Sequence, residues 1–156
     1  MFRKMRRFKQ ELSYDESVGI LTNEHRGVLA LLGDDNYPYT VPMNHIYLDG
    51  KIYFHGAQEG HKHDACVNHP KASYCVIDEG IKLDGEWWNT FKSVIAFGKI
   101  SIVEDEEKKL EILTHLGDKY FPNPEETEMA LERLFERTEI FELNIEHITG
   151  KLVREK

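Results

Sequence analysis

The segment from His55 to Lys62 has the residue types of an anion-binding site. Its sequence, HGAQEGHK, passes from small residues at the end of a predicted strand into the start of a predicted helix. Free backbone N–H groups and the helix dipole favour anions at such a start, and the Lys62 ammonium adds a full positive charge. The segment is therefore a candidate phosphate site. It lacks the GxxxxGK[ST] spacing of a P-loop, so a solvated lysine in a first helical turn stays open as the alternative.

A second unusual segment is the strand that carries Pro38 and Pro42. Each proline removes a hydrogen-bond donor, so we expect an edge strand, or one that leaves the sheet near Pro42. Backbone groups at Val41, Met43 and Asn44 would then be free to face a ligand. An irregular edge strand without a ligand is the alternative interpretation.

Histidines and an aspartate gather in the same part of the chain, and imidazole and carboxylate groups are common metal ligands. His61 and His63 are two positions apart, which places them on different sides of a helix. No HExxH or paired CxxC motif accompanies them. We therefore predict no metal site, while haem ligation by one of the histidines stays open. The complete set is His55, His61, His63, Asp64 and His69.

An aromatic cluster, Trp87, Trp88 and Phe91, lies in and just after the segment Glu79–Asn89, which is the one candidate for a flexible insert. Packing against the core is one interpretation of these rings. An exposed aromatic loop that forms an interface or covers a ligand is the other.

The predicted elements that position these residues are mainly strands. Ser13 and Glu16 have the spacing of a capping box at a helix start, and Asp49-Gly50 between apolar runs predicts a tight hairpin. Gly98 in the middle of a long strand predicts a bend. Short turns make the first three strands antiparallel. The six strand-forming runs are Gly27–Gly33, Tyr37–Leu48, Lys51–Ala57, Lys71–Asp78, Ser93–Val103 and Glu139–Ile148.

Helical patterns surround these strands. A short helix is expected between Gly60 and Pro70. A charged helix is expected over Asp105–Phe121, with an apolar face formed by Leu110, Leu113, Leu116 and Tyr120. Asn123 and Pro124 have the residue types that start another helix. Because no βαβ alternation is present, we predict an α+β, mainly β fold: a six-stranded antiparallel barrel with peripheral helices.

Composition limits the function classes further. The chain has 156 residues and a mass of 18.3 kDa, which predicts one domain over 1–156 with a basic N-terminal arm over 1–12. The net charge of −8 disfavours nucleic-acid binding. The sequence has no apolar run long enough for a membrane span or a signal peptide. Cys66 and Cys75 lack CxxC partners. We expect a cytoplasmic protein with free thiols.

Four stretches together resemble a known family. They are MRRFKQELSYDESVGIL, GDDNYPYTVPMNHIYLDGKIYFHGAQEGHKHDA, FKSVIAFGKI and EHITGK. In this order they are similar to the nitroimidazole-resistance (Nim) proteins, a branch of the pyridoxamine 5′-phosphate oxidase-like flavoproteins. The resemblance covers almost the whole chain, and its most specific part runs from Tyr37 to Asp64.

The resemblance implies a split β-barrel that forms a homodimer with FMN sites between the subunits. The strand residues Val41 to Asn44 would lie along the flavin ring, and His61 and Lys62 would hold the phosphate. Ser93 and Val94, together with the preceding aromatic residues, would be contributed to the flavin site by the partner subunit. The full implied set is Val41, Pro42, Met43, Asn44, His55, Gly56, Ala57, His61, Lys62, Ser93 and Val94.

The implied function is that of an FMN-dependent oxidoreductase, in which reduced FMN passes electrons to a small electron-poor acceptor such as a nitro-aromatic. His55 is the candidate catalytic residue, as a proton donor or a group that orients the ring, because imidazole changes charge near neutral pH. A structural His55 is the alternative. At the level of the whole protein, the alternative function is a flavin- or haem-binding sensor or carrier without turnover.

Overall fold

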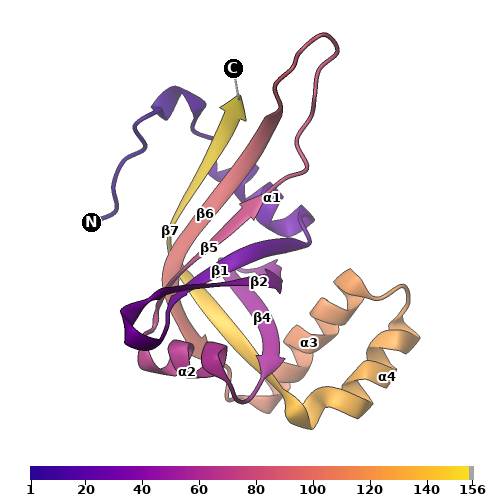
Figure 1. Cartoon of the computed structure of the whole chain (residues 1–156). Coiled ribbons are helices and arrows are strands. Elements are labelled where there is room, and N and C mark those ends of the chain that lie inside the picture. Colours follow the sequence, from indigo (N-terminus) through magenta and orange to yellow (C-terminus); the bar gives the residue numbers. More distant parts are fainter. Residues whose placement is uncertain (155–156) are drawn as a thin grey trace.

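The computed structural model describes residues 1–154 and contains one curled antiparallel sheet (Figure 1). Seven strands follow one another across the sheet in the order β2-β1-β5-β6-β7-β4-β3. The predicted mainly β, split-barrel fold is confirmed, with seven strands in place of six. The strands are β1 Arg26–Leu32, β2 Pro38–Asn44, β3 Ile46–Leu48, β4 Lys51–Ala57, β5 Lys71–Ile77, β6 Thr90–Ile102 and β7 Thr138–Arg154.

Four α-helices accompany the sheet in the described part of the chain. In Figure 1, α2 lies below the strands, and α3 and α4 form a hairpin beside the end of β4. The capping box predicted for Ser13 and Glu16 is present at the start of α1. The α-helices are α1 Tyr14–Asn23, α2 His61–Asn68, α3 Glu106–Tyr120 and α4 Pro124–Leu134; short 3₁₀ turns lie at Phe8–Gln10, Asp34–Asn36 and Phe135–Arg137.

The additional strand arises because the predicted run Tyr37–Leu48 divides at His45. Its first part, β2, pairs with β1, and its second part, β3, pairs with β4 at the opposite edge of the sheet. The prediction of an edge strand is confirmed for β2, and Pro42 remains paired with Val28 within it. The sequence does not reveal that the run changes its partner strand at His45, because the residues on both sides of His45 are strand-forming.

The hairpin and the bend have the backbone geometry that was predicted for them. Asp49 and Gly50 have φ values of 48° and 79°, as a type I′ turn requires, and join β3 to β4. The β6–β7 register shifts between Phe97 and Gly98. A Cβ atom at Gly98 would overlap the backbone carbonyl of Asn144, so glycine permits the close approach that curls the long strands.

Two apolar clusters fix the arrangement. The larger one fills the concave side of the sheet and includes Phe54, Tyr74 and Phe141. The smaller one joins α3 to the opposite side of the sheet. Leu110, predicted on the inner face of this helix, is 47% exposed, because it lies roughly 120° round the helix from Leu116. The other three predicted residues, Leu113, Leu116 and Tyr120, do pack in this cluster. Ile112 joins them against Ile46, Tyr53 and Ile140 of the sheet.

The N-terminal arm and the loop between β5 and β6 both lie away from the α3–α4 hairpin (Figure 1). The N-terminal arm follows β7: the Leu12 N–H donates to the Gly150 carbonyl at 2.9 Å, and the Phe2 ring stacks on His147. The loop between β5 and β6 extends beyond the sheet in Figure 1, with Trp87 76% exposed. The loop and the α3–α4 hairpin lie at different ends of the sheet (Figure 1). No helix among residues 1–154 is long and apolar enough to cross a membrane.

Candidate functional site

An open pocket of about 710 Å³ lies where the ends of β2 and β4 meet the start of α2 and the beginning of β7. A volume of this size is in the range of small-molecule sites. Seven of the residues implied as cofactor ligands line it: Pro42, Met43, Asn44, His55, Gly56, Ala57 and Lys62. The tertiary structure thus brings the two segments singled out in the sequence to one place.

Lys62 provides the pocket with a partly buried positive charge. Its Nζ atom lies 3.8 Å from the Met43 sulfur and 5.1 Å from the centre of the Phe141 ring. Burial lowers the pKa of the Lys62 ammonium, and Cys66 and Glu139 offset this effect in part. Among the described residues, no carboxylate is at ion-pair distance from Nζ. A bound anion would therefore supply the partner that this cation lacks.

The backbone around Lys62 leaves room for such an anion. A Cβ atom at Gly56 would overlap the Lys62 ammonium, so glycine keeps this wall of the pocket open. Helix α2 begins after Gly60, which has φ of 106° and offers no side chain to cap the helix. The first amide groups of the helix therefore have no intrahelical acceptor. Together these features can bind a phosphate group.

His55 lies at the centre of the site, in the last part of β4 opposite Ile140 of β7. Its ring is exposed on one side, yet the surrounding walls remove enough water to lower the pKa of the imidazole below its ordinary value. Lys62 adds a second, smaller lowering of the same pKa. The ring is therefore mostly neutral at neutral pH, and it can donate or accept a hydrogen bond toward a bound molecule.

A family model described as pyridoxamine 5′-phosphate oxidase matches residues 13–152. The chain belongs to this family. The predicted resemblance is confirmed at this level, and the match includes the whole pocket. A search of curated proteins found no match.

Solved structures from the same fold agree with the family assignment. A candidate 5-nitroimidazole antibiotic resistance protein from Bacteroides thetaiotaomicron has a TM-score of 0.76 at 16% identity, over 92% of this chain and 87% of the other. A FAD-binding protein from Mesorhizobium loti has a TM-score of 0.68 at 24% identity, over 92% of this chain and 97% of the other. A FAD and heme binding protein from Mycobacterium smegmatis has a TM-score of 0.74 at 19% identity, over 92% of this chain and 73% of the other. At these identities the similarity concerns the fold.

Four residues of the implied family set do not line the pocket: His61, Val41, Ser93 and Val94. His61 turns toward the β1–β2 turn, where its ring stacks on Tyr39 at 4.0 Å and its Nε2 atom accepts the Asp34 N–H at 3.3 Å. Because the Asp34 carboxylate is also near this ring, an anion gains less from His61 than from Lys62. Val41 packs against the apolar core beside the pocket.

Ser93 and Val94, the residues implied to come from the partner subunit, point to opposite sides of β6. Val94 is fully buried in the core of this chain, whereas Ser93 is partly exposed on the convex face of the sheet. Neighbouring residues of a strand alternate in this way. The side chain of Val94 is therefore not available to a flavin on a partner, and the role of Ser93 stays a prediction.

The predicted separation of the nearby histidines is confirmed. Whereas His61 contacts the β1–β2 turn, the Nδ1 atom of His63 lies 2.7 Å from the Glu139 carboxylate on β7. Glu139 is thereby engaged by a neighbour other than Lys62. The thiol of Cys66 is buried, which raises its pKa to about 12, and both cysteines are free.

The sequence analysis missed the residues that the end of α4 and the start of β7 supply. Leu134, Arg137 and Thr138 line the pocket opposite β2. Arg137 adds a second cation to a pocket in an otherwise acidic protein. No local motif marks these positions, because they reach the site only through the pairing of β7 with β4.

A buried hydrogen-bond network holds the corner between β2 and β3. The fully buried His45 ring contacts the Leu21 carbonyl at 2.8 Å and the Tyr74 hydroxyl at 2.9 Å. At the end of α3, the Tyr120 hydroxyl accepts the His45 N–H at 2.9 Å, and Lys119 donates to the His45 carbonyl at 3.1 Å. The network fixes the chain just after Asn44 and so positions one wall of the pocket.

Proposed function

We propose that this protein binds FMN in the pocket between β2, β4 and α2, and that it is an oxidoreductase for small electron-poor acceptors such as nitro-aromatics. The observation that carries the proposal is the partly buried Lys62 ammonium, which has no carboxylate partner within residues 1–154 and lies beside Gly56 and the uncapped start of α2. These groups fit a phosphate. The family and the flavin-binding proteins of the same fold support the choice of a flavin.

The remaining lining residues fit the rest of the cofactor. Met43, Gly56 and Ala57 offer apolar and backbone surface to a flat ring system, while Lys62 and Arg137 lie where negative charge would be held. When bound, fully reduced FMN supplies two electrons and two protons, which convert a nitro group to a nitroso group and water and leave the flavin oxidised. His55 is placed to hold or donate a proton beside the acceptor.

The proposal includes a homodimer in which each FMN site is completed by the partner subunit. An apolar row crosses the convex face of the sheet from the pocket: Val28, Cys75 and Ile95 are cross-strand neighbours, and Pro42 at the pocket is the next residue beyond Val28. Val28 is 40% exposed and Ile95 is 37% exposed. A second copy that covers this row would also close the open side of the pocket.

The alternative is a flavin- or haem-binding sensor or carrier without turnover, which the fold shared with FAD and heme binding proteins favours. The visible spectrum of the purified protein distinguishes bound flavin, bound haem and an empty site. The oxidoreductase proposal predicts a flavin that dithionite bleaches and a nitro-aromatic then reoxidises in anaerobic solution. A flavin that stays reduced with this acceptor would support the alternative, and a protein that does not bind FMN at all would overturn both flavin proposals.

A further inference from the structure

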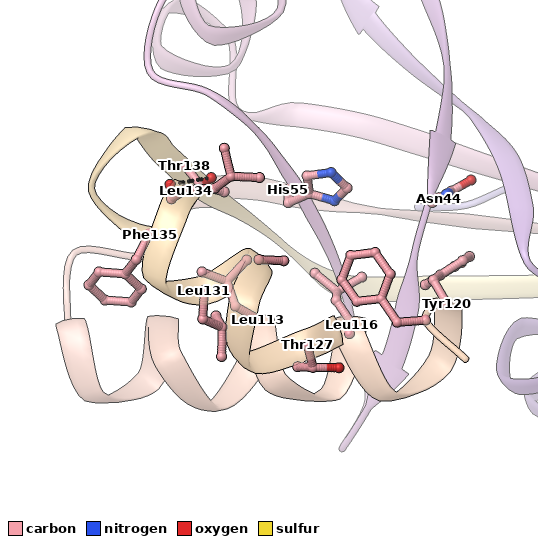
Figure 2. Close-up of a pocket in the computed structure, with 13 residues that line it drawn as sticks. Asn44, His55, Leu113, Leu116, Tyr120, Thr127, Leu131, Leu134, Phe135 and Thr138 are labelled. Atoms are coloured by element: carbon pink, nitrogen blue, oxygen red, sulfur yellow. Dashed lines mark hydrogen bonds between the residues drawn. The ribbon is translucent and has the colours of Figure 1, made fainter. Parts of the chain in front are cut away.

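The β4–β7 strand pair separates two sides of the site that differ in charge. On the side of the α3–α4 hairpin lies a cavity of about 300 Å³, lined by His55, Thr138 and leucines of both helices (Figure 2). The residues that line it within 1–154 include no lysine, arginine, aspartate or glutamate. Gly56 and Glu139 are paired across the two strands, and both face the opposite side, because neighbouring residues of a strand alternate.

Glu139 shares this second side with the Lys62 ammonium. A Cβ atom at Gly56, directly opposite Glu139, would overlap the Lys62 Nζ atom. The side chains of a cross-strand pair begin about 4.5–5.5 Å apart, so a glutamate at position 139 is long enough to reach Lys62. Burial has the largest effect on the pKa of Lys62 and lowers it, while Glu139 is near enough to raise it in part. Within residues 1–154, however, no carboxylate is at ion-pair distance from Lys62.

His63 accounts for this separation, because it holds the Glu139 carboxylate elsewhere. The His63 Nδ1 atom lies 2.7 Å from the Glu139 Oε2 atom, and the two side chains are only 24% and 13% exposed. A carboxylate only accepts hydrogen bonds, so the Nδ1 atom carries the hydrogen and donates it. Limited access of water strengthens such a bond. The first turn of α2 thus directs a cation, Lys62, to the pocket and a donor, His63, to Glu139.

We propose that His63 is a positioning residue of the phosphate site, which keeps the Glu139 carboxylate away from Lys62 so that the ammonium is available to the FMN phosphate. Without the His63 donor, the Glu139 carboxylate would turn to Lys62. FMN would then have to displace this carboxylate before its phosphate could bind. The inference rests on the proposed function, since it names the residue that prepares the phosphate site of that function.

The test removes the His63 donor and compares two flavins. His63→Phe keeps a ring at this position and removes the N–H group. FMN affinity, measured by fluorescence titration of the FMN-free protein, should fall by about 5- to 30-fold, which corresponds to about 1–2 kcal/mol for the ion pair that FMN must break. Riboflavin has no phosphate, so its affinity should stay within about twofold of the wild-type value.

Glu139→Gln provides the matched control. The glutamine carbonyl still accepts a hydrogen bond from His63 but has no charge, so this variant should bind FMN at least as tightly as the wild type does. In the double variant His63→Phe/Glu139→Gln, FMN affinity should return to within about twofold of that of Glu139→Gln alone. A purely structural role of the His63–Glu139 contact would not be rescued in this way, because the double variant lacks the contact altogether.

The pKa of Lys62 is a readout that needs no flavin, and NMR titration of protein with labelled lysine measures it. An ion pair with Glu139 raises the pKa of the ammonium, so this pKa should be higher in His63→Phe than in the wild type and should not be raised in the double variant. His63→Asn places an amide N–H close to the position of Nδ1, and it should keep the wild-type pKa and FMN affinity. If His63→Phe does not fold, His63→Leu replaces it in every comparison, because leucine also lacks a donor.

Wild-type FMN affinity in the folded His63→Phe variant would overturn the inference. Weaker FMN binding by Glu139→Gln, or a loss that the double variant does not restore, would also overturn it. Failure of the proposed function is a separate result, because it is seen in the wild type as a lack of FMN binding. In that case the pKa of Lys62 in the flavin-free variants still decides whether His63 keeps Glu139 away from this cation.

Discussion

At the scale of single residues, Lys62 determines how strongly the proposed site holds a phosphate. Lys62→Ala removes a hydrogen bond to a charged group, worth about 1.5–3 kcal/mol, while the amide groups at the start of α2 remain. FMN affinity should therefore fall by roughly 10- to 150-fold without being abolished. Fluorescence titration of the FMN-free protein measures this change.

Riboflavin is the matched control for Lys62, because it has the same ring without the phosphate. It should bind the wild type and Lys62→Ala with nearly equal affinity. If the substitution weakened both flavins equally, Lys62 would support the ring pocket or the fold, and the phosphate assignment would be wrong.

His55 is the residue whose replacement should affect rate more than binding. At a pH below the lowered pKa of His55, where the ring is protonated, His55→Gln should leave FMN bound and slow acceptor reduction by the pre-reduced protein by about 10²–10⁴-fold, the usual contribution of a general acid. The wild-type rate should fall as the pH rises above the lowered pKa of His55, because the protonated donor is lost, and the variant should not show this fall. Stopped-flow absorbance measures both effects.

The exposed His69, which follows α2 outside the pocket, is the control for His55. His69→Gln should reduce the acceptor at the wild-type rate. An unchanged rate and pH profile in His55→Gln would instead assign His55 a structural role.

At the scale of elements, the buried His45 joins α1, the β2–β3 corner and α3. Burial lowers the pKa of His45 to about 4; the hydrogen bond to the Leu21 carbonyl opposes this shift in part, and the nearby Lys119 and His25 contribute to it. Between pH 4 and 6.5 the unfolded chain therefore binds more protons at this residue than the folded protein does. The stability that His45 contributes is fully present above pH 6.5 and is lost as the pH falls toward 4.

The expected loss of unfolding free energy from this residue is roughly 3 kcal/mol across the window. His45→Gln keeps a hydrogen-bonding side chain that does not titrate, so the variant should be less stable at pH 7 but less sensitive to acid. Urea unfolding at several pH values measures the difference. His115→Gln, at an exposed position of α3, should keep the wild-type pH dependence; the same dependence in His45→Gln would contradict the assignment.

At the scale of the whole molecule, the apolar row on the convex face predicts a homodimer. Ile95→Glu places a charge on this row in a protein whose net charge is already −8, so two copies would bury and repel like charges. We expect the wild type to sediment at twice 18.3 kDa and Ile95→Glu to sediment as a monomer with weakened FMN binding. Leu110→Glu, on the exposed side of α3, should remain dimeric.

A wild type that sediments only as a monomer at micromolar concentration, with FMN bound, would contradict the shared site. A stable dimer buries at least about 1,000 Å² between its subunits. The apolar side chains on this face are scattered, so the second copy must cover the whole row to bury this area. The dimer and the site are thus tested together by one substitution far from Lys62.

Much of the local structure was predictable because it depends on neighbours in the sequence. The capping box at Ser13, the hairpin at Asp49-Gly50 and the bend at Gly98 each follow from the backbone preferences of one or two residues. Lys62 and Gly56 were identified for a similar reason, since a strand end followed by a helix start is a local pattern. The antiparallel, mainly β fold follows from the short connections.

What the tertiary structure alone decided depends on contacts between distant segments. The division of one apolar run at His45 follows from a network that Leu21, Tyr74 and Tyr120 complete. Arg137 joins the pocket through the pairing of β7 with β4. Periodicity reports which face of an element is apolar, but not which distant surface that face will meet.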